Sequence, residues 1–316
     1  VLARPRPRQV ETHLPETVEG ELTKAIHSDL FTYLRTDKLG DYKLLAKVTE
    51  KRIRKASAPL YEELVAYFRG KSVDVVYIPN GRVAHQRLAL LAAKSLGIQV
   101  KFFEIGRAVP NSAYIGTCQI HDRANTQVEA RRHIETGSPG SSREVAMEWL
   151  AQRMVPGSSL NPFSRQWGQQ SLDATPNSKS HDAPRAVFFT SSADEFSSYG
   201  AEWEGHAWSD QFEAFASILA LLTVRGVQCT LRVHPALGDK APRYFRREVT
   251  SVLQLTKSYP SLDVIWHNDS KSSYELVAES DFVFVGRSTL GLESSLLGKC
   301  VWTTTPARYD ETADVR

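Results

Sequence analysis

The order of apolar and polar positions divides the chain into a helix-rich start, an irregular middle and a regular second half. In residues 16–69, apolar side chains recur at intervals of three and four, as in LTKAIHSDLFTYL, which is the spacing of one helix face. Residues 73–79 and 99–106 are short β-rich runs on either side of a helical pattern in residues 82–97. A strand, a helix and a strand of these lengths predict a right-handed βαβ unit.

Residues 107–183 lose this rhythm, with turn clusters, one moderate helix at 142–154 and a polar stretch at 168–184 that we expect to cross between two domains. From residue 185 the alternation becomes regular. Strands are predicted at 185–192, 227–235, 262–268, 282–286 and 300–305, with helices between them at 209–226, 241–260, 272–281 and 288–298. This alternation predicts the α/β class, with an open, mostly parallel sheet covered on both faces.

Composition and charge narrow the partners. The 316 residues are 41% hydrophobic and 24% charged, an ordinary globular balance. The formal net charge of +3 is too small to indicate binding to nucleic acid, which we do not expect as a partner. The basic stretches RPRPR (4–8) and KRIRK (51–55) are interpreted as solvated faces, with contact to an anionic surface as the alternative.

The cysteines and the apolar runs indicate a cytoplasmic protein. Cys118, Cys229 and Cys300 lie far apart without metal-ligand spacing, and the last two fall in apolar runs typical of buried strands, so we expect reduced core thiols. No apolar stretch approaches the roughly 20 residues that span a bilayer, and the N-terminus lacks the pattern of a signal peptide. Peripheral contact with the cytoplasmic face of the inner membrane stays open.

The loops that follow the predicted strands are the places to look for chemistry, because ligands of parallel sheets bind at the carboxyl ends of the strands. In GRSTLGLE, Gly286 allows a tight turn and Ser288 or Thr289 stands where a helix N-cap is expected. A helix N-terminus attracts phosphate. Glu293, one turn further in, would accept two hydroxyls of a ribose or another sugar. The alternative is an ordinary capped helix whose Glu293 faces solvent.

In RVHP, His234 ends a strand and Pro235 fixes its backbone, so we expect the imidazole to project into the crevice. The ring would hydrogen-bond a phosphate, either as a cation or as a neutral donor. The alternative is a structural histidine.

Asp194 and Glu195 in SSADEF also follow a strand. Paired carboxylates there suit a general base, or a nucleophile in a retaining transfer, and they suit helix capping or a surface turn equally well. Ser272, Ser273 and Tyr274 begin a short helix where a nucleobase or a ribose could be held by backbone groups, although capping explains them as well.

The first half contributes three further candidates. Asn80 and Arg82 lie between a strand and a helix, and Glu104 ends the next strand, so all three are expected at the rim that faces the second domain. Such side chains suit a polar acceptor or a catalytic role. The alternative is a turn and a salt bridge at the end of a strand.

Several signatures are absent from the sequence. It contains no GxGxxG opening a βαβ unit, no GxxxxGK[ST], no HExxH and no GxSxG. Dinucleotide redox chemistry, P-loop hydrolysis, zincin proteolysis and hydrolase-type nucleophilic catalysis therefore lose support. A cleft that holds a nucleotide without a P-loop remains.

The segments SSADEF, LRVHP and SSYELVAESDFVFVGRSTLGLESSLLGKCV resemble the C-terminal, nucleotide-sugar-binding domain of GT-B glycosyltransferases of bacterial capsule and surface-polysaccharide biosynthesis. NGR and EIG look like the N-terminal domain of the same group, so the resemblance covers about residues 73–106 and 185–305. It implies two Rossmann-like domains with parallel sheets that face each other across a cleft. The expected parts are a helical N-terminal region (1–70), an acceptor domain with an irregular insertion (71–180) and a nucleotide-sugar-binding domain (181–316).

Transferases that use CMP-activated sugars, the sialyl- and Kdo-transferases among them, carry a similar His-Pro motif and a Ser/Thr motif that contact the cytidine phosphate. The resemblance implies phosphate binding by His234, Ser288 and Thr289, ribose or sugar binding by Glu293, and a catalytic carboxylate at Asp194 or Glu195. It also implies no bound metal and no cofactor, because helix dipoles and side chains neutralise the leaving phosphate and the nucleotide sugar is a substrate.

The function implied is the transfer of a sugar from a nucleotide-sugar donor to a glycan or glycolipid acceptor of capsule, O-antigen or lipopolysaccharide type. A sugar-nucleotide epimerase of the GT-B-like class is one alternative, although such enzymes usually carry an EE pair where this chain has ESS (293–295). A non-catalytic module of a polysaccharide-assembly protein is another. The chain also departs from the family, because we find no obvious first strand and no C-terminal helix that crosses back, which favours a fragment or a reduced architecture.

Overall fold

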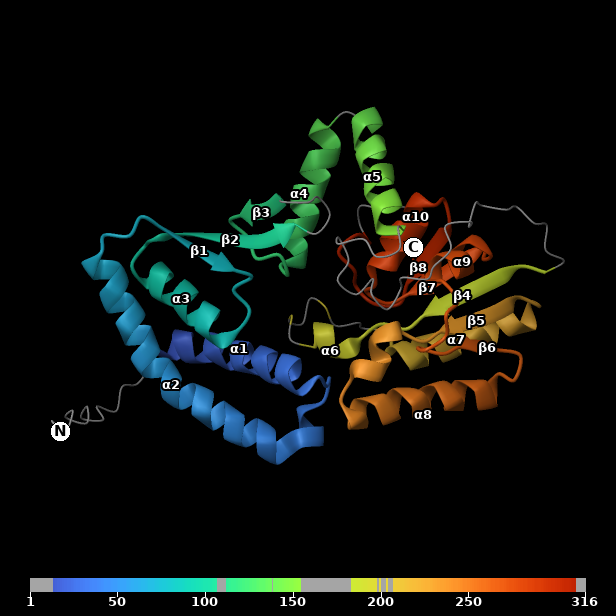
Figure 1. The fold of residues 1–316 in the computed structure, drawn as a ribbon, viewed down its shortest axis with the longest axis horizontal. Helices are drawn as coiled ribbons and strands as arrows, with labels where there is room; N and C mark the ends of the chain where they lie inside the picture. The colour runs from blue at the N-terminus through green and yellow to red at the C-terminus, as the bar shows by residue number, and fades with distance from the viewer. Residues whose placement is uncertain are drawn as a thin grey trace.

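The computed structural model describes residues 14–106, 112–137, 139–154, 183–197, 199, 203 and 207–310. Within them the chain forms a three-stranded sheet of order β1-β2-β3 and a five-stranded sheet of order β6-β5-β4-β7-β8 (Figure 1). The strands of the first sheet are β1 (Val75–Pro79), β2 (Gln99–Gly106) and β3 (Ser112–Gly116). β1 and β2 are parallel, as the predicted βαβ unit requires, and β3 is antiparallel to β2.

Helices cover the first sheet, and their apolar spacing is the one that the sequence predicts. They are α1 (Glu16–Leu34), α2 (Lys43–Gly70) and α3 (Ala84–Ser95), with the short 3-10 helix η1 (Leu39–Tyr42) between the first two. Leu22, Ile26 and Leu30 follow one another at intervals of four along α1 and are fully buried against α2 and α3. The helix-rich beginning of the chain is therefore confirmed.

The second sheet confirms the predicted alternation. Its strands are β4 (Arg185–Phe189), β5 (Gln228–Arg232), β6 (Asp263–Ile265), β7 (Phe282–Val285) and β8 (Cys300–Thr303). All neighbouring pairs are parallel. The intervening helices are α7 (Gln211–Val224), α8 (Pro242–Ser258), α9 (Ser273–Ala278) and α10 (Thr289–Leu296).

The central strand β4 packs into two cores. Phe188 points to one face of the sheet, where it packs with Phe215 and stacks on Phe284 at 4.7 Å between ring centroids. Val187 points to the opposite face and packs in a core with residues of α9 and α10. The chain leaves β4 towards β5 and β6, then returns to the other side for β7 and β8. The carboxyl end of β4 is therefore the topological switch point, where α/β sheets bind ligands.

The irregular middle of the sequence contains more structure than its pattern predicts. β3 and α4 (Arg123–Thr136) both lie in the stretch that we interpret as turns, and α5 (Pro139–Met154) begins three residues before the predicted helix at 142–154. The expected first domain (71–180) includes α5, whereas in the structure this helix packs against α10. Leu150 of α5 is buried in the core of the second sheet. The domain limits themselves stay predictions, and most of the expected crossing at 168–184 lies outside the described residues.

Ion pairs join the helices and loops that accompany the two sheets. Arg123 of α4 donates two hydrogen bonds to the Asp310 carboxylate, each of 2.8 Å. Arg247 of α8 forms ion pairs with Asp37 and Asp41, which follow α1. None of the described helices has both the length and the apolar character needed to cross a bilayer.

All three cysteines are free. Cys229 is buried in β5, and burial raises the pKa of its thiol to about 11. Cys300 is exposed, so the prediction of a core thiol is wrong there, because it begins the edge strand β8.

Candidate functional site

A cavity of about 270 Å³ opens at the carboxyl ends of β4, β5 and β7. Of the residues predicted from the sequence, it is lined by Glu195, His234, Pro235, Ser273, Ser288, Thr289 and Glu293. The other predicted residues, Asp194, Tyr274, Asn80, Arg82 and Glu104, do not line it. Four loops that are far apart in the sequence thus meet at the switch point.

His234 presents a neutral hydrogen-bond donor to this cavity. Its backbone N–H donates to Thr190 Oγ1 at 2.8 Å, which holds the loop against the end of β4. Its ring Nδ1 accepts from the Ala236 N–H at 3.2 Å, so the proton of the neutral ring resides on Nε2. Burial, together with the cations of Lys240 and Arg232, lowers the pKa of His234 to about 4. Of the two protonation states considered from the sequence, the structure favours the neutral donor.

The start of α10 forms the opposite wall. Ser288 is its N-cap, and the hydroxyl accepts from the Leu290 N–H at 3.2 Å, while Thr289 is the first helical residue. A side chain at Gly286 would place its Cβ only 2.8 Å from Ser191 Oγ, so glycine lets the loops after β4 and β7 approach each other. Ser191 Oγ is buried and has no hydrogen-bond partner in the described ranges. The N-terminus of α10 and this hydroxyl offer donors to an anion.

Arg232 places a buried positive charge beneath the cavity. The side chain is 3% exposed, and its two terminal nitrogens donate to the carbonyls of Trp266 (2.6 Å) and Asp269 (3.1 Å). Its Nε is buried and has no hydrogen-bond partner among the residues that the structure describes, and Arg232 lines the cavity. Arg153 and Arg287 also line the cavity, together with the carboxylates of Glu195 and Glu293, so cations outnumber carboxylates in its lining by one. No pattern in the sequence singled out Arg232, although it stands two residues before His234 at the end of the same strand.

Glu293 is buried rather than facing solvent, which corrects one of the two interpretations of this helix. It is 2% exposed, and Arg153 Nε donates to Oε1 at 2.8 Å while the Tyr274 hydroxyl donates to Oε2 at 2.6 Å. Arg153 also donates to Thr289 Oγ1 at 3.4 Å. Burial and the adjacent carboxylate raise the pKa of Tyr274 above its usual range. Arg153 comes from α5, and no local signal in the sequence links it to this site.

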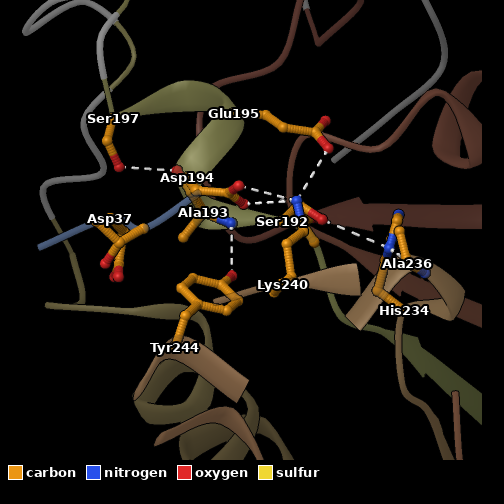
Figure 2. A network of polar contacts seen from close by, with 12 residues as sticks. Asp37, Ser192, Ala193, Asp194, Glu195, Ser197, His234, Ala236, Lys240 and Tyr244 are labelled. Carbon is orange, nitrogen blue, oxygen red and sulfur yellow. Dashed lines mark hydrogen bonds and ion pairs between the residues drawn. The ribbon is translucent and has the colours of Figure 1, made fainter. Parts of the chain in front are cut away.

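Asp194 and Glu195 have different environments, although they are adjacent in α6 (Ala193–Phe196). Figure 2 shows Lys240 Nζ between them. Lys240 Nζ lies 2.8 and 2.9 Å from the two Asp194 oxygens, and the side chains of Lys240 and Asp194 are both buried. Glu195 Oε1 is 3.4 Å from the same nitrogen, but this side chain is 49% exposed and borders the cavity. Glu195 is therefore the carboxylate of the pair that can reach a substrate, and Asp194 is held in a buried ion pair.

The helix start at α9 confirms the capping interpretation. Ser272 is the N-cap and forms a capping box with Glu275, whose carboxylate accepts from the Ser272 N–H at 3.0 Å. Ser273 lies in the cavity wall and is 2% exposed. Tyr274 lies beneath the wall, where its hydroxyl holds Glu293.

Asn80 and Arg82 lie at the seam between the two sheets, not in the cavity. Asn80 has a φ of 62°, and its side-chain amide lies 3.0 Å from His121 Nε2. The Arg82 guanidinium lies 5.1 Å above the ring of Tyr199, which stacks on His121 at 4.1 Å between centroids. Burial and the cations of Arg308 and Arg82 lower the pKa of His121 to about 3. Glu104 contributes to the same seam through its electrostatic interaction with Arg308.

Gln211 fixes the loop that carries Ser191. Its Oε1 accepts from the Ser191 N–H at 2.8 Å, and its Nε2 donates to the Ser191 carbonyl at 3.1 Å and to Glu248 Oε2 at 3.2 Å. Burial, followed by the charge of Asp37, raises the pKa of Glu248 to about 8, although Arg247 opposes this shift. The support of the cavity therefore includes a carboxyl group that is protonated at neutral pH.

The raised pKa of Glu248 predicts that stability falls as pH rises. Because the folded state holds this proton more tightly than the unfolded state, the contribution is complete below pH 4.5 and is lost as pH rises to about 8. Glu248→Gln keeps an acceptor for Gln211 but cannot ionise. Its free energy of unfolding relative to wild type should rise by about 3 kcal/mol between pH 5 and pH 8. Urea denaturation at both pH values measures the difference in free energy of unfolding between variant and wild type. For the exposed control Glu63→Gln this difference should be the same at both pH values, and the same result for Glu248→Gln would contradict the prediction.

Within the described ranges, no group of three or more His, Cys, Asp and Glu side chains is placed to hold a metal ion. The positive charges at the cavity are instead those of arginines. Metal independence stays a prediction.

No protein-family model matches the chain, and no curated protein matches it. Among solved structures, it is similar to KpsC of Thermosulfurimonas dismutans, described as a beta Kdo 2,4 transferase, at 15% identity and a TM-score of 0.43, over 74% of this chain and 69% of that one. A second KpsC structure from the same organism, described as a beta Kdo 2,7 transferase, has 12% sequence identity and a TM-score of 0.42, over 78% of this chain and 70% of that one. A UDP-GlcNAc 2-epimerase of Methanocaldococcus jannaschii, solved with UDP-GlcNAc and UDP, has 12% sequence identity and a TM-score of 0.34, over 80% of this chain and 66% of that one.

Proposed function

We propose that this chain is a glycosyltransferase that takes a sugar from a nucleotide-sugar donor and transfers it to a surface glycan or glycolipid. The observation that carries the proposal is the set of unsatisfied donors at the switch point. Within the described part of the chain, Arg232 Nε and Ser191 Oγ are buried without hydrogen-bond partners, and both residues line the cavity that the N-terminus of α10 also borders, while His234 carries its proton on Nε2. Buried polar groups are normally satisfied, so these donors are explained by an anionic ligand such as the phosphates of a nucleotide.

Glu195 is the general base of the proposed reaction. It would accept the proton of the acceptor hydroxyl while the acceptor oxygen bonds to the anomeric carbon of the donor sugar. The bond from that carbon to the phosphate oxygen breaks, and the nucleotide leaves with the electron pair. The negative charge that develops on the phosphate is then stabilised by Arg232 and His234, which are already fixed in place.

Glu293 would bind the ribose or the sugar, as the resemblance implies. Arg153 and Tyr274 each occupy one of its oxygens, but a carboxylate oxygen has two lone pairs and can accept again. The two partners orient the carboxylate. The proposal has three further parts. The donor carries CMP, UDP or another nucleotide, the protein is cytoplasmic, and it contacts the membrane peripherally.

The proposal predicts nucleotide binding that depends on His234. In a thermal-shift and calorimetric panel of CMP, UDP, GDP and dTDP, at least one should bind the wild type and raise its melting temperature. His234→Ala should weaken that nucleotide by about 10- to 100-fold, because a hydrogen bond to a charged group contributes about 1.5–3 kcal/mol. His85→Ala, on the exposed part of α3, is the control and should bind like wild type.

Two outcomes would redirect the proposal. If no nucleotide binds, or if His234→Ala binds as tightly as wild type, the assignment of the cavity to a nucleotide fails. If a nucleotide does bind, product analysis distinguishes a glycosyltransferase from the two alternatives. Conversion of the sugar nucleotide to an isomer without an acceptor indicates an epimerase, and binding with no turnover in the presence of glycan acceptors indicates a non-catalytic module.

A further inference from the structure

The outward face of the first half of α2 combines apolar and positively charged side chains. Leu44, Leu45 and Val48 lie within one and a half turns of this helix and are 77%, 47% and 41% exposed. Ala46 is buried, so the helix is anchored by one face and turns these three residues away from the core. A contiguous exposed apolar patch that is rimmed by polar residues is typical of an interaction site.

Positive charges surround these apolar residues. Lys43, Lys47, Lys51, Arg52 and Lys55 are all exposed, and none of them has an ion pair in the described part of the chain. We name the eight residues the basic apolar face of α2. The adjacent acid, Glu50, is bound by Arg54, which also pairs with Glu19 of α1, so the carboxylate of Glu50 does not offset the charge of these cations.

We propose that the basic apolar face of α2 docks on an anionic lipid bilayer. A helix that lies in a membrane interface buries apolar side chains at the boundary of the headgroups while its cations contact anionic lipids. The stems of the lysines lie along the apolar surface and their ammonium groups reach the phosphates. The thirteen residues from Lys43 to Lys55 extend for about 18 Å, so this face can contact several headgroups at once.

Other occupants fit this face less well. Nucleic acid would use the cations but would leave three apolar side chains without a partner. A second copy of the chain would bring five more positive charges into the contact. A bilayer with anionic lipids matches both properties, and Figure 1 shows α2 along the outer edge of the molecule, away from α5 and α10, which border the cavity. Docking would leave the cavity accessible.

The test is sedimentation of the protein with vesicles. The wild type should bind vesicles of phosphatidylglycerol mixed with phosphatidylcholine, should not bind phosphatidylcholine alone, and should be released by salt. Each cation near an anionic surface contributes about fivefold, so replacing Lys47, Lys51, Arg52 and Lys55 by Gln should weaken binding by at least about 100-fold. Leu44→Ser combined with Val48→Ser should weaken it by about tenfold.

Matched controls separate this face from general charge and hydrophobicity. Lys94, Arg225 and Lys257 are exposed on other helices and are replaced by Gln, and Leu221 and Val224 of α7, 58% and 87% exposed, are replaced by Ser. Both control variants should bind vesicles within about threefold of wild type. Thermal unfolding verifies that every variant is folded.

Several outcomes would overturn the proposal. They are absence of vesicle binding by the folded wild type, equal losses in the control variants, and equal binding by the Gln variant of α2. A fourth is a dimer that Leu44→Ser abolishes while vesicle binding is unchanged or absent. Vesicle binding is measured without a nucleotide, so its result does not depend on the proposed function.

Discussion

Lys240→Met should lower the free energy of unfolding by about 3–5 kcal/mol. The Lys240 side chain is 1% exposed and Asp194 is 7% exposed, so the substitution leaves a carboxylate buried beside an apolar side chain. Such a group must either stay charged without a partner or take up a proton, and both cost free energy. Chemical denaturation at neutral pH measures the loss.

The double variant Lys240→Met with Asp194→Asn is the decisive control. It removes both charges, so it should recover most of the stability lost in the single variant. Lys271→Met breaks an ion pair with Glu279 whose partners are 35% and 46% exposed, and it should change stability by less than about 1 kcal/mol. If Lys240→Met were as mild as Lys271→Met, the buried pair would not have the structural role that we assign to it.

Glu195→Gln should reduce the rate of sugar transfer by about 10²- to 10⁴-fold while nucleotide affinity stays within about twofold of wild type. The reason is that the amide cannot accept the proton of the acceptor hydroxyl, whereas the donors to the phosphate are untouched. Single-turnover kinetics with a radiolabelled donor, together with a nucleotide titration, separates the two effects.

Glu104→Gln tests the third carboxylate that the sequence proposes for catalysis. Glu104 lies on β2 and does not line the cavity, so we expect this variant to transfer sugar at close to the wild-type rate. A loss confined to Glu104→Gln would move the catalytic role to the first sheet. Equal activity of Glu195→Gln and wild type would remove Glu195 from the mechanism.

The sequence predicted the second sheet well because each of its elements is encoded locally. Every strand there is a short apolar run and every helix has its own apolar spacing, so neighbouring signals reinforce one another. β3 and α4 were missed for the opposite reason. In α4, of the described residues, only Gln127 is buried, so its sequence carries almost no apolar periodicity, and its polar contacts with Asp310 depend on residues far away in the chain.

The candidate site was predicted in part for a related reason. Residues at the ends of parallel strands meet whenever the sheet forms, so His234, Ser288 and Glu195 could be grouped from topology alone. Lys240 and Arg153 could not, because each joins the site through an ion pair with a carboxylate 46 or 140 residues away. The sequence also cannot show which carboxylate of an adjacent pair is buried, and only the fold distinguishes Asp194 from Glu195.

The neutral ring of His234 makes the charge of the cavity less dependent on pH. A histidine that gained a proton near neutral pH would make the cavity attract phosphate more strongly in mild acid. Because the pKa of His234 is lowered to about 4, its charge is constant across the range in which most cells operate. The positive charge of the cavity then comes from arginines, which do not titrate there. We therefore expect the cavity's electrostatic attraction for an anionic ligand to change little with pH near neutrality.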